Sequence, residues 1–173
     1  MTKWIFGYTS LMWDPGFDYE DSEPARVFGY HRSLCVYSHL YRGTPEQPGL
    51  VAGLLPSGTC KGRAFRVTNT QWPAVKSYLH GREMVYGVYQ PKWMTAQLRQ
   101  RRIPVYGFSA DPAHPQFAGR LTDDSAAELI SRGRGISGSG TAYLSNLIDH
   151  LAALGIRDQG LTRIAALCGA RGA

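Results

Sequence analysis

The sequence predicts an α+β fold, in which a sheet is built first and helices follow. Short apolar runs, separated by Gly- and Pro-containing turns, dominate the first part of the chain and are typical of strands. Helical patterns dominate the last part. Hydrophobic residues make up 43% and charged residues 18% of the chain, which is a globular balance. Strands followed by helices are the pattern of an α+β protein, and 173 residues suit one domain, residues 1–173.

The first strands are expected at residues 3–8, 25–38, 50–55 and 62–67, and they suggest a curved antiparallel sheet. The run "LPSGTCKG" is interpreted as a turn between the last two strands. A helix is expected from about residue 71, with Thr70 as its N-cap and Pro73 tolerated in its first turn.

Two more strands are expected within residues 86–98 and 103–110, followed by the Pro-rich loop "ADPAHPQFAG". The rest of the chain is expected to be helical at residues 123–132, 141–154 and 159–168. Gly155 is well placed to end the middle helix of these.

The three cysteines, Cys35, Cys60 and Cys168, are scattered and have no C-x-x-C spacing. Neither a disulfide framework nor a zinc site is therefore indicated, and the dispersed histidines suggest that the protein binds no metal. No apolar run is long enough to span a bilayer, and residues 1–8 have no signal-peptide pattern. We expect a cytoplasmic protein without a membrane partner.

The net charge of +6 favours anionic partners, which include nucleic acid, an acidic membrane surface and a small acidic metabolite. Each basic cluster taken alone, at residues 99–102 and 132–134, is more simply a solvated surface. "KGRAFRV" overlaps an RNA-recognition signature, but Arg63 and Arg66 stand in or beside the places of its stacking aromatics. "GRGISG" follows a helical segment instead of a strand, so we reject a dinucleotide site and expect a connecting turn.

The stretch "WIFGYTSLMWDPGF" begins as a buried strand and breaks at Gly7 into a loop rich in aromatics and hydroxyls. Connecting segments run over the surface, where exposed aromatic rings usually contact a partner. The stretch is therefore a candidate binding site.

Glu83 is the most unusual charged residue in the pattern. Val75, Leu79 and Glu83 are spaced four apart, so the carboxylate lies on the stripe that turns toward the core. It also lies at the negative end of the helix dipole, and both effects should raise its pKa, as a general acid or base requires. The alternative is a solvated glutamate paired with Arg82, and the pattern alone leaves both interpretations open.

Five segments appear in an order that resembles the ChaC family of glutathione-specific γ-glutamylcyclotransferases, and they cover nearly the whole chain. They read "FGYTSLMWDPGF", "YRGTPEQPGLVAGLLPSGTCKGRAFRV", "YLHGREMVYGVY", "ADPAHPQFAG" and "GISGSGTAYLSNLIDHLAALGIRDQGL". The resemblance implies a closed, mixed β-barrel with surrounding and C-terminal helices. It also implies that the α-amine of the γ-glutamyl group attacks its own side-chain carbonyl, giving 5-oxoproline and cysteinylglycine without a cofactor.

The same resemblance assigns roles to two residues: Glu83 corresponds to the family's catalytic glutamate, and Tyr143 to a tyrosine that reaches the substrate. Arg66 is a weaker candidate that rests on its strand position, which could point it inward at a substrate carboxylate or outward at water. Thr9 departs from the family, whose loop has glycine there, and we expect it to keep a negative φ with its side chain turned away from the substrate. The substrate loop corresponds to Phe6, Gly7, Tyr8, Thr9, Ser10 and Leu11.

The leading interpretation is an enzyme that acts on glutathione, with no nucleic-acid partner and the oligomeric state left open. One alternative is a cyclotransferase that acts on another γ-glutamyl amide or amine, which Thr9 could favour by narrowing the pocket. The other is a non-catalytic relative that binds a γ-glutamyl ligand or a nucleic acid.

Overall fold

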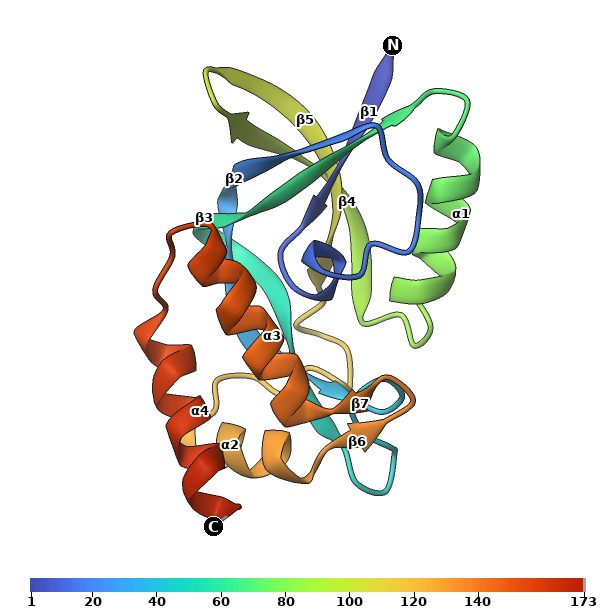
Figure 1. Ribbon diagram of the computed structural model, residues 1–173. Helices are drawn as coiled ribbons and strands as arrows, with labels where there is room; N and C mark the ends of the chain where they lie inside the picture. The colour runs from blue at the N-terminus through green and yellow to red at the C-terminus, as the bar shows by residue number, and fades with distance from the viewer. Residues whose placement is uncertain (173) are drawn as a thin grey trace. The chain divides into compact units, whose positions relative to one another are not determined.

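Five strands close into a barrel in the computed structural model, which describes residues 1–172 (Figure 1). The order around the barrel is β1-β3-β2-β4-β5, and the pairing of β1 is antiparallel with β3 but parallel with β5. The barrel is therefore closed and mixed, which confirms the predicted fold class. The strands are β1 (Thr2–Gly7), β2 (Asp21–Ser38), β3 (Gly49–Thr68), β4 (Tyr89–Leu98) and β5 (Arg101–Ala110).

The chain divides into two compact units, and both β2 and β3 contribute residues to each of them. The first unit holds residues 1–33 and 53–114, and the second holds residues 34–52 and the chain from Pro115 onward. The single domain over residues 1–173 stays a prediction. The helices are η1 (a 3-10 turn, Ser10–Met12) and α1 (Trp72–Glu83) in the first unit, with α2 (Asp123–Arg132), α3 (Gly140–Ala153) and α4 (Gln159–Arg171) in the second.

Alternation along β1 separates the two apolar layers of the first unit. Trp4 and Phe6 belong to the cluster that fills the barrel, because successive side chains of a strand point to opposite faces, and Tyr8, just beyond the strand, belongs to the same cluster. Ile5 belongs instead to the layer between the barrel and α1. This second layer docks α1 on the outside of the barrel (Figure 1), and it consists of Ile5, Leu11, Val67, Val75, Leu79, Tyr106 and Phe108.

In the second unit, α2 and α3 lie within one residue of their predicted bounds, whereas α4 begins as predicted but continues to Arg171, three residues beyond its predicted end. The side chains of Thr122, Ser139 and Asp158 each accept a hydrogen bond from an amide in the first turn of their helix. Gly155 has φ +74° just beyond α3, which confirms it as the residue that ends this helix. The run "GRGISG" forms the small hairpin of β6 (Arg134–Gly135) and β7 (Gly138–Ser139), so it is a connection between helices. Among the described helices, none is long and apolar enough to cross a membrane.

The predicted turn at "LPSGTCKG" is wrong, since β3 runs without interruption through it. Ser57 and Gly58 have φ values of 98° and 72°, as the expected turn residues would, but they bend the strand without ending it. Residues 21–24 are a second correction, because β2 begins at Asp21 and Glu23 is only 5% exposed. Pairing around the closed barrel extends both strands beyond what their local sequences indicate.

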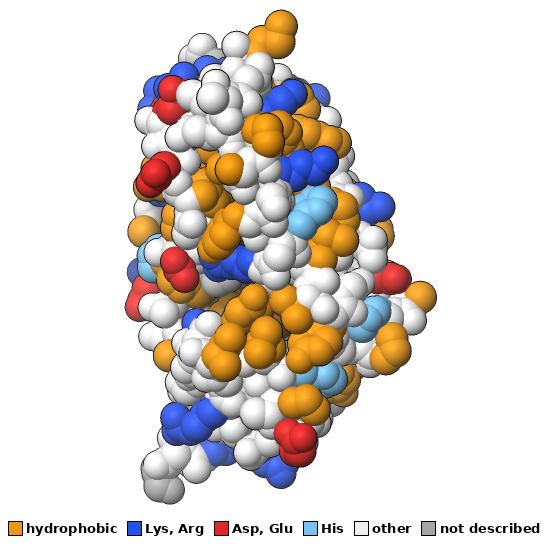
Figure 2. All heavy atoms as spheres, turned by 90° about the vertical axis from the view of Figure 1, so that its right-hand side faces the viewer, with side chains coloured by type: hydrophobic (Ala, Val, Ile, Leu, Met, Phe, Trp, Pro, Cys, Tyr) orange, Lys and Arg blue, Asp and Glu red, His pale blue; other side chains and the backbone are white. Residues whose placement is uncertain are grey.

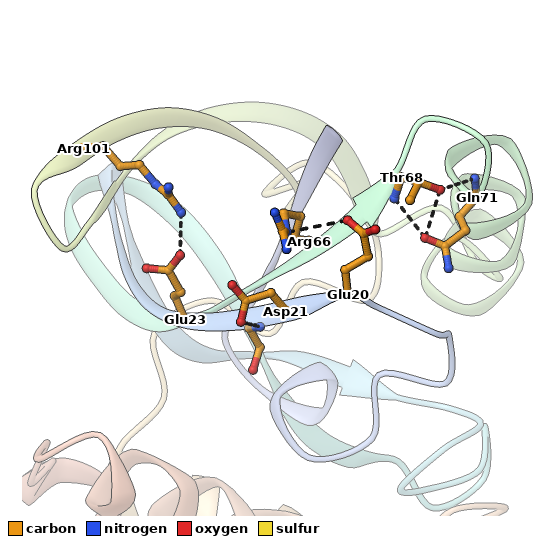
Figure 3. Close-up of polar contacts among 8 residues, drawn as sticks. Glu20, Asp21, Glu23, Arg66, Thr68, Gln71 and Arg101 are labelled. Atoms are coloured by element: carbon orange, nitrogen blue, oxygen red, sulfur yellow. Dashed lines mark hydrogen bonds and ion pairs between the residues drawn. The ribbon is translucent and has the colours of Figure 1, made fainter. Parts of the chain in front are cut away.

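The predicted N-cap of α1 is also wrong. The helix begins at Trp72, and the two side chains that close the preceding turn belong to Thr68 and Gln71 (Figure 3). The amide of Gln71 donates to Thr68 Oγ1 over 3.0 Å, and the amide of Thr68 donates to Gln71 Oε1 over 2.9 Å. This reciprocal pair has the T-x-x-Q spacing of a capping box. Pro73 does lie in the first turn, as predicted.

Replacing Thr68 by valine should lower the free energy of unfolding by about 1 kcal/mol, because it removes the hydroxyl from the capping pair. Thr70→Val is the matched control, since Thr70 is exposed, and it should change the stability by less than about 0.5 kcal/mol. Urea denaturation of both variants measures the difference. A larger loss in Thr70→Val than in Thr68→Val would restore Thr70 as the cap.

Candidate active site

The loop that follows β1 folds back onto the end of the strand. The amide of Met12 donates to the Thr9 carbonyl over 2.8 Å, and the amide of Asp14 donates to the Ser10 carbonyl over 2.8 Å. A Cβ atom on Gly7 would lie 3.0 Å from Cβ of Leu11, so glycine at the end of the strand permits this close return. The loop is therefore a compact turn packed on β1.

Within this loop, Tyr8 and Leu11 are buried, whereas Thr9 and Ser10 are partly exposed. Thr9 has φ −141°, as predicted, so its backbone does not need the left-handed conformation that a β-branched residue resists. The expected orientation of the Thr9 side chain away from the substrate stays a prediction. Thr9 and Ser10 therefore reach solvent from this part of the loop, whereas the Tyr8 ring, which the sequence indicated would be exposed, is buried.

Glu83 lies at the last position of α1, beyond the buried residues Val75 and Leu79. Its side chain is 19% exposed, and Nε of Arg82 lies 3.3 Å from its Oε1. Burial raises the pKa of the Glu83 carboxyl above its usual range, and the neighbouring Arg82 charge offsets only part of that rise. The carboxyl group therefore holds a proton more readily than a surface glutamate does, which suits proton transfer near neutral pH.

Arg82 links the end of α1 to the loop after β1. Its Nη1 donates to the carbonyls of Asp14 and Pro15 over 2.6 and 3.3 Å, and its Nη2 donates to Ser10 Oγ over 3.2 Å. The Arg82 side chain is 14% exposed. One guanidinium thus contacts both Ser10 and Glu83, and it brings these two predicted site residues together.

A second arginine holds the start of the loop. Nε of Arg32 donates to the Tyr8 carbonyl over 2.8 Å, and Nη2 of Arg32 donates to the Lys61 carbonyl. Sequence reasoning missed Arg32 and treated Arg82 only as a neighbour that neutralises Glu83. The four-residue spacing of Tyr78 and Arg82 was a usable signal, because Arg82 Nη1 donates to the Tyr78 hydroxyl over 3.1 Å.

The structure places Arg66 with other partners. It pairs with Trp4 across the β1–β3 ladder, and its Nε lies 3.7 Å from Oε2 of Glu20 (Figure 3). The amide of Glu20 also donates to the Arg66 carbonyl. The predicted role of Arg66 toward a substrate carboxylate stays a prediction, and its ion pair with Glu20 competes with that role.

Tyr143 lies in the second unit and is 3% exposed. Its hydroxyl oxygen accepts a hydrogen bond from the amide of Ala52 over 3.0 Å, and the Arg42 guanidinium carbon lies 5.6 Å from the centre of its ring. These contacts give Tyr143 a structural role within its own unit. A contact with substrate stays a prediction.

Apolar side chains reach the surface on the side where α1 lies in Figure 1, which Figure 2 turns toward the viewer. The exposed apolar residues near Glu83 in sequence are Tyr78, Val85 and Tyr86. A hollow bordered by Glu23, Arg99, Gln100 and Arg101 lies at the turn between β4 and β5, and no predicted site residue borders it. The described residues contain no group of three or more His, Cys, Asp or Glu side chains that could hold a metal ion.

Comparison with known proteins identifies the family of this chain. The profile of the family described as "ChaC-like protein" matches residues 3–171. The glutathione-specific γ-glutamylcyclotransferase of Escherichia coli K12 is 35% identical over 159 residues, which are 91% of this chain and 69% of that protein. The human glutathione-specific γ-glutamylcyclotransferase 1 is 34% identical over 161 residues, which are 90% of this chain and 72% of that protein.

A solved structure supports the same conclusion for the fold. The crystal structure of a glutathione-specific γ-glutamyl cyclotransferase from yeast superposes with a TM-score of 0.89, covers 97% of this chain and 96% of its own, and is 22% identical. The closed barrel with its helices is therefore a γ-glutamylcyclotransferase fold. Since the family profile and both relatives cover nearly the whole chain, the protein belongs to the ChaC-like family.

Proposed function

We propose that the protein is a glutathione-specific γ-glutamylcyclotransferase, and therefore a lyase. The names of its relatives support glutathione as the substrate, in preference to other γ-glutamyl amides. The structural observation that carries the proposal is the largely buried Glu83 side chain, 19% exposed, which one arginine connects to the loop after β1. The cytoplasmic location stays a prediction that rests on the sequence.

The proposed reaction is an intramolecular acyl transfer. The α-ammonium of the γ-glutamyl group loses a proton to Glu83, and the free amine attacks the γ-carbonyl carbon of the same residue. A new C–N bond closes the five-membered ring, and the old amide C–N bond breaks. The leaving nitrogen takes a proton, so the products are 5-oxoproline and cysteinylglycine, with no change in oxidation state and no water consumed.

The raised pKa of Glu83 suits both proton transfers of this reaction. A carboxylate with an ordinary pKa is a weak base toward an ammonium group, whereas burial makes Glu83 a stronger one. Once protonated, the same group can return the proton to the leaving nitrogen. Since Glu83 must begin in its ionised form, the rate should fall as the pH drops through its raised pKa.

The loop after β1 is proposed to hold the γ-glutamyl head through its backbone, as its resemblance to the family implies. Ring closure requires the amine and the γ-carbonyl to be held in an attacking orientation, and fixing two groups in this way removes much of the entropic barrier. The contacts within residues 9–14 and the hydrogen bond from Arg32 to Tyr8 make this loop rigid enough for that task.

Replacing Glu83 by glutamine should lower kcat on glutathione by about 100-fold or more, because the amide keeps the shape but cannot accept the proton. The measurement is 5-oxoproline formation at saturating glutathione, with circular dichroism to verify the fold. If the wild-type protein binds glutathione without forming 5-oxoproline, it is a binding protein and the proposal fails. Near-normal turnover of the folded variant would remove Glu83 from the mechanism.

The same variant should be more stable than the wild type at pH 7. Folding raises the pKa of Glu83, so the native state binds its proton more tightly than the unfolded state does. The stabilising contribution of this group is complete below its unfolded pKa and is lost as the pH rises through the folded value. Thermal denaturation should therefore show a higher Tm for Glu83→Gln at pH 7, and a smaller difference at pH 4. An advantage that grows toward low pH would contradict the raised pKa.

Replacing Thr9 by glycine should lower KM for glutathione and leave kcat nearly unchanged. The negative φ of Thr9 shows that this backbone does not depend on glycine, so the change should affect how closely the ligand approaches the loop backbone and not the loop conformation itself. Such a split between KM and kcat is the signature of altered ground-state binding. Steady-state kinetics measure it. A glycine variant with a higher KM or a lower kcat would make Thr9 a positive contributor to the site.

A further inference from the structure

Arg82 makes polar contacts with two parts of the proposed site, its own helix α1 and the loop after β1. Within α1 it contacts the Tyr78 hydroxyl and Oε1 of Glu83. From the loop after β1 it contacts Ser10 Oγ and the carbonyl oxygens of Asp14 and Pro15. The Nε, Nη1 and Nη2 groups are all engaged, so its planar guanidinium uses the fixed fork of donors that a lysine ammonium lacks.

The contrast with Arg132 shows that this arrangement is not an ordinary ion pair at the end of a helix. Arg132 ends α2 as Arg82 nearly ends α1, and its Nη1 lies 3.0 Å from Oε1 of Glu128. The side chains of that pair are 58% and 50% exposed, whereas those of Arg82 and Glu83 are 14% and 19% exposed. An exposed pair of this kind contributes little to stability or geometry. The less exposed Arg82 guanidinium instead contacts both the end of α1 and the loop after β1.

We propose that Arg82 is a positioning residue that holds residues 10–15 at a fixed separation from the Glu83 carboxylate. This inference rests on the proposed function, because the loop is the segment that would hold the γ-glutamyl head. The bond to Ser10 and the bonds to the two loop carbonyls fix the loop, while the contact with Glu83 fixes the orientation of the base. Arg82 thus aligns the two parts of the site by acting through the loop and through the Glu83 carboxylate.

The charge of Arg82 has a second effect, which a purely structural residue would not have. Arg82 is the charged neighbour that lowers the pKa of Glu83 against the effect of burial. Asp14 presents its carbonyl oxygen to the guanidinium, and His80 is hydrogen-bonded to the Tyr106 hydroxyl over 2.6 Å. Removal of the positive charge should therefore raise the pKa of Glu83 further and move the acidic limb of the rate profile to higher pH.

The test compares Arg82→Gln, Arg82→Lys and the matched control Arg132→Gln across a pH series on glutathione. Arg82→Gln should lose about tenfold or more in kcat/KM, which corresponds to one lost hydrogen bond to a charged group, and its acidic limb should move to higher pH. Arg82→Lys keeps the charge without the fork, so it should lose kcat/KM while its acidic limb stays close to that of the wild type. Arg132→Gln should match the wild type in both respects.

Two outcomes would overturn the inference. In the first, both Arg82 variants lose thermal stability, but at a temperature where they are folded their kcat/KM and the acidic limb of their rate profiles match those of the wild type. Arg82 would then have only a structural role. The other is an equal shift of the limb in the lysine and glutamine variants. If Arg82→Gln does not fold, Ser10→Ala is the alternative variant, because it removes a single hydrogen bond of the guanidinium. It should raise KM a few-fold without moving the acidic limb of the rate profile. An unchanged KM would count against the inference.

A titration that does not depend on turnover separates this inference from the proposed function. The Glu83 side-chain carboxyl carbon can be followed by NMR in the wild type and in both Arg82 variants. The pKa should rise in Arg82→Gln and remain near the wild-type value in Arg82→Lys, whether or not the protein cleaves glutathione. Failure of 5-oxoproline formation would refute the function alone, whereas an unchanged titration in Arg82→Gln would refute the role of Arg82.

Discussion

The Arg82 guanidinium lies between the end of α1 and the loop after β1, and the proposed alignment of the site depends on its contacts with both. On one side it contacts Glu83, whose burial opposes ionisation, and on the other it donates to Ser10 and to two loop carbonyls. A buried carboxylate without a cationic neighbour would remain protonated, and one with a strong, optimally placed partner would be a weak base. The net effect here is a raised pKa, which a proton acceptor for an amine requires.

The barrel explains why these two segments meet. Phe6 and Tyr8 point into its interior, and Ile5 points outward to the layer that carries Leu79 of α1. The strand that ends at Gly7 is therefore held on both faces, and the loop that follows starts from a fixed point. Because α1 packs on that same outer layer, its last turn ends beside the loop, and a short arginine bridge is sufficient to connect them.

The sequence predicted the elements whose signals are local. Helical patterns predicted the three C-terminal helices, Gly155 predicted the end of the middle one, and the spacing of Val75, Leu79 and Glu83 marked the carboxylate as a candidate acid or base. Features that depend on distant partners were missed. Ser57 and Gly58 have backbone angles of a turn, so only pairing with neighbouring strands of the barrel shows that β3 continues through them. The contacts of Arg82 with the loop join residues far apart in the chain, so no local pattern indicates them.

In the proposed reaction, the γ-glutamyl head must lie between the loop backbone and residue 83. A crystal structure of the Glu83→Gln variant with intact glutathione tests this most directly, because the substrate should bind without being cleaved. We expect the α-amine of glutathione within about 3 Å of the residue 83 amide, which is the reach of a proton acceptor, and the γ-glutamyl carboxylate against the backbone of residues 8–11. Glutathione bound elsewhere, such as beside Arg66 and Glu20, with residue 83 out of reach of the amine, would contradict it.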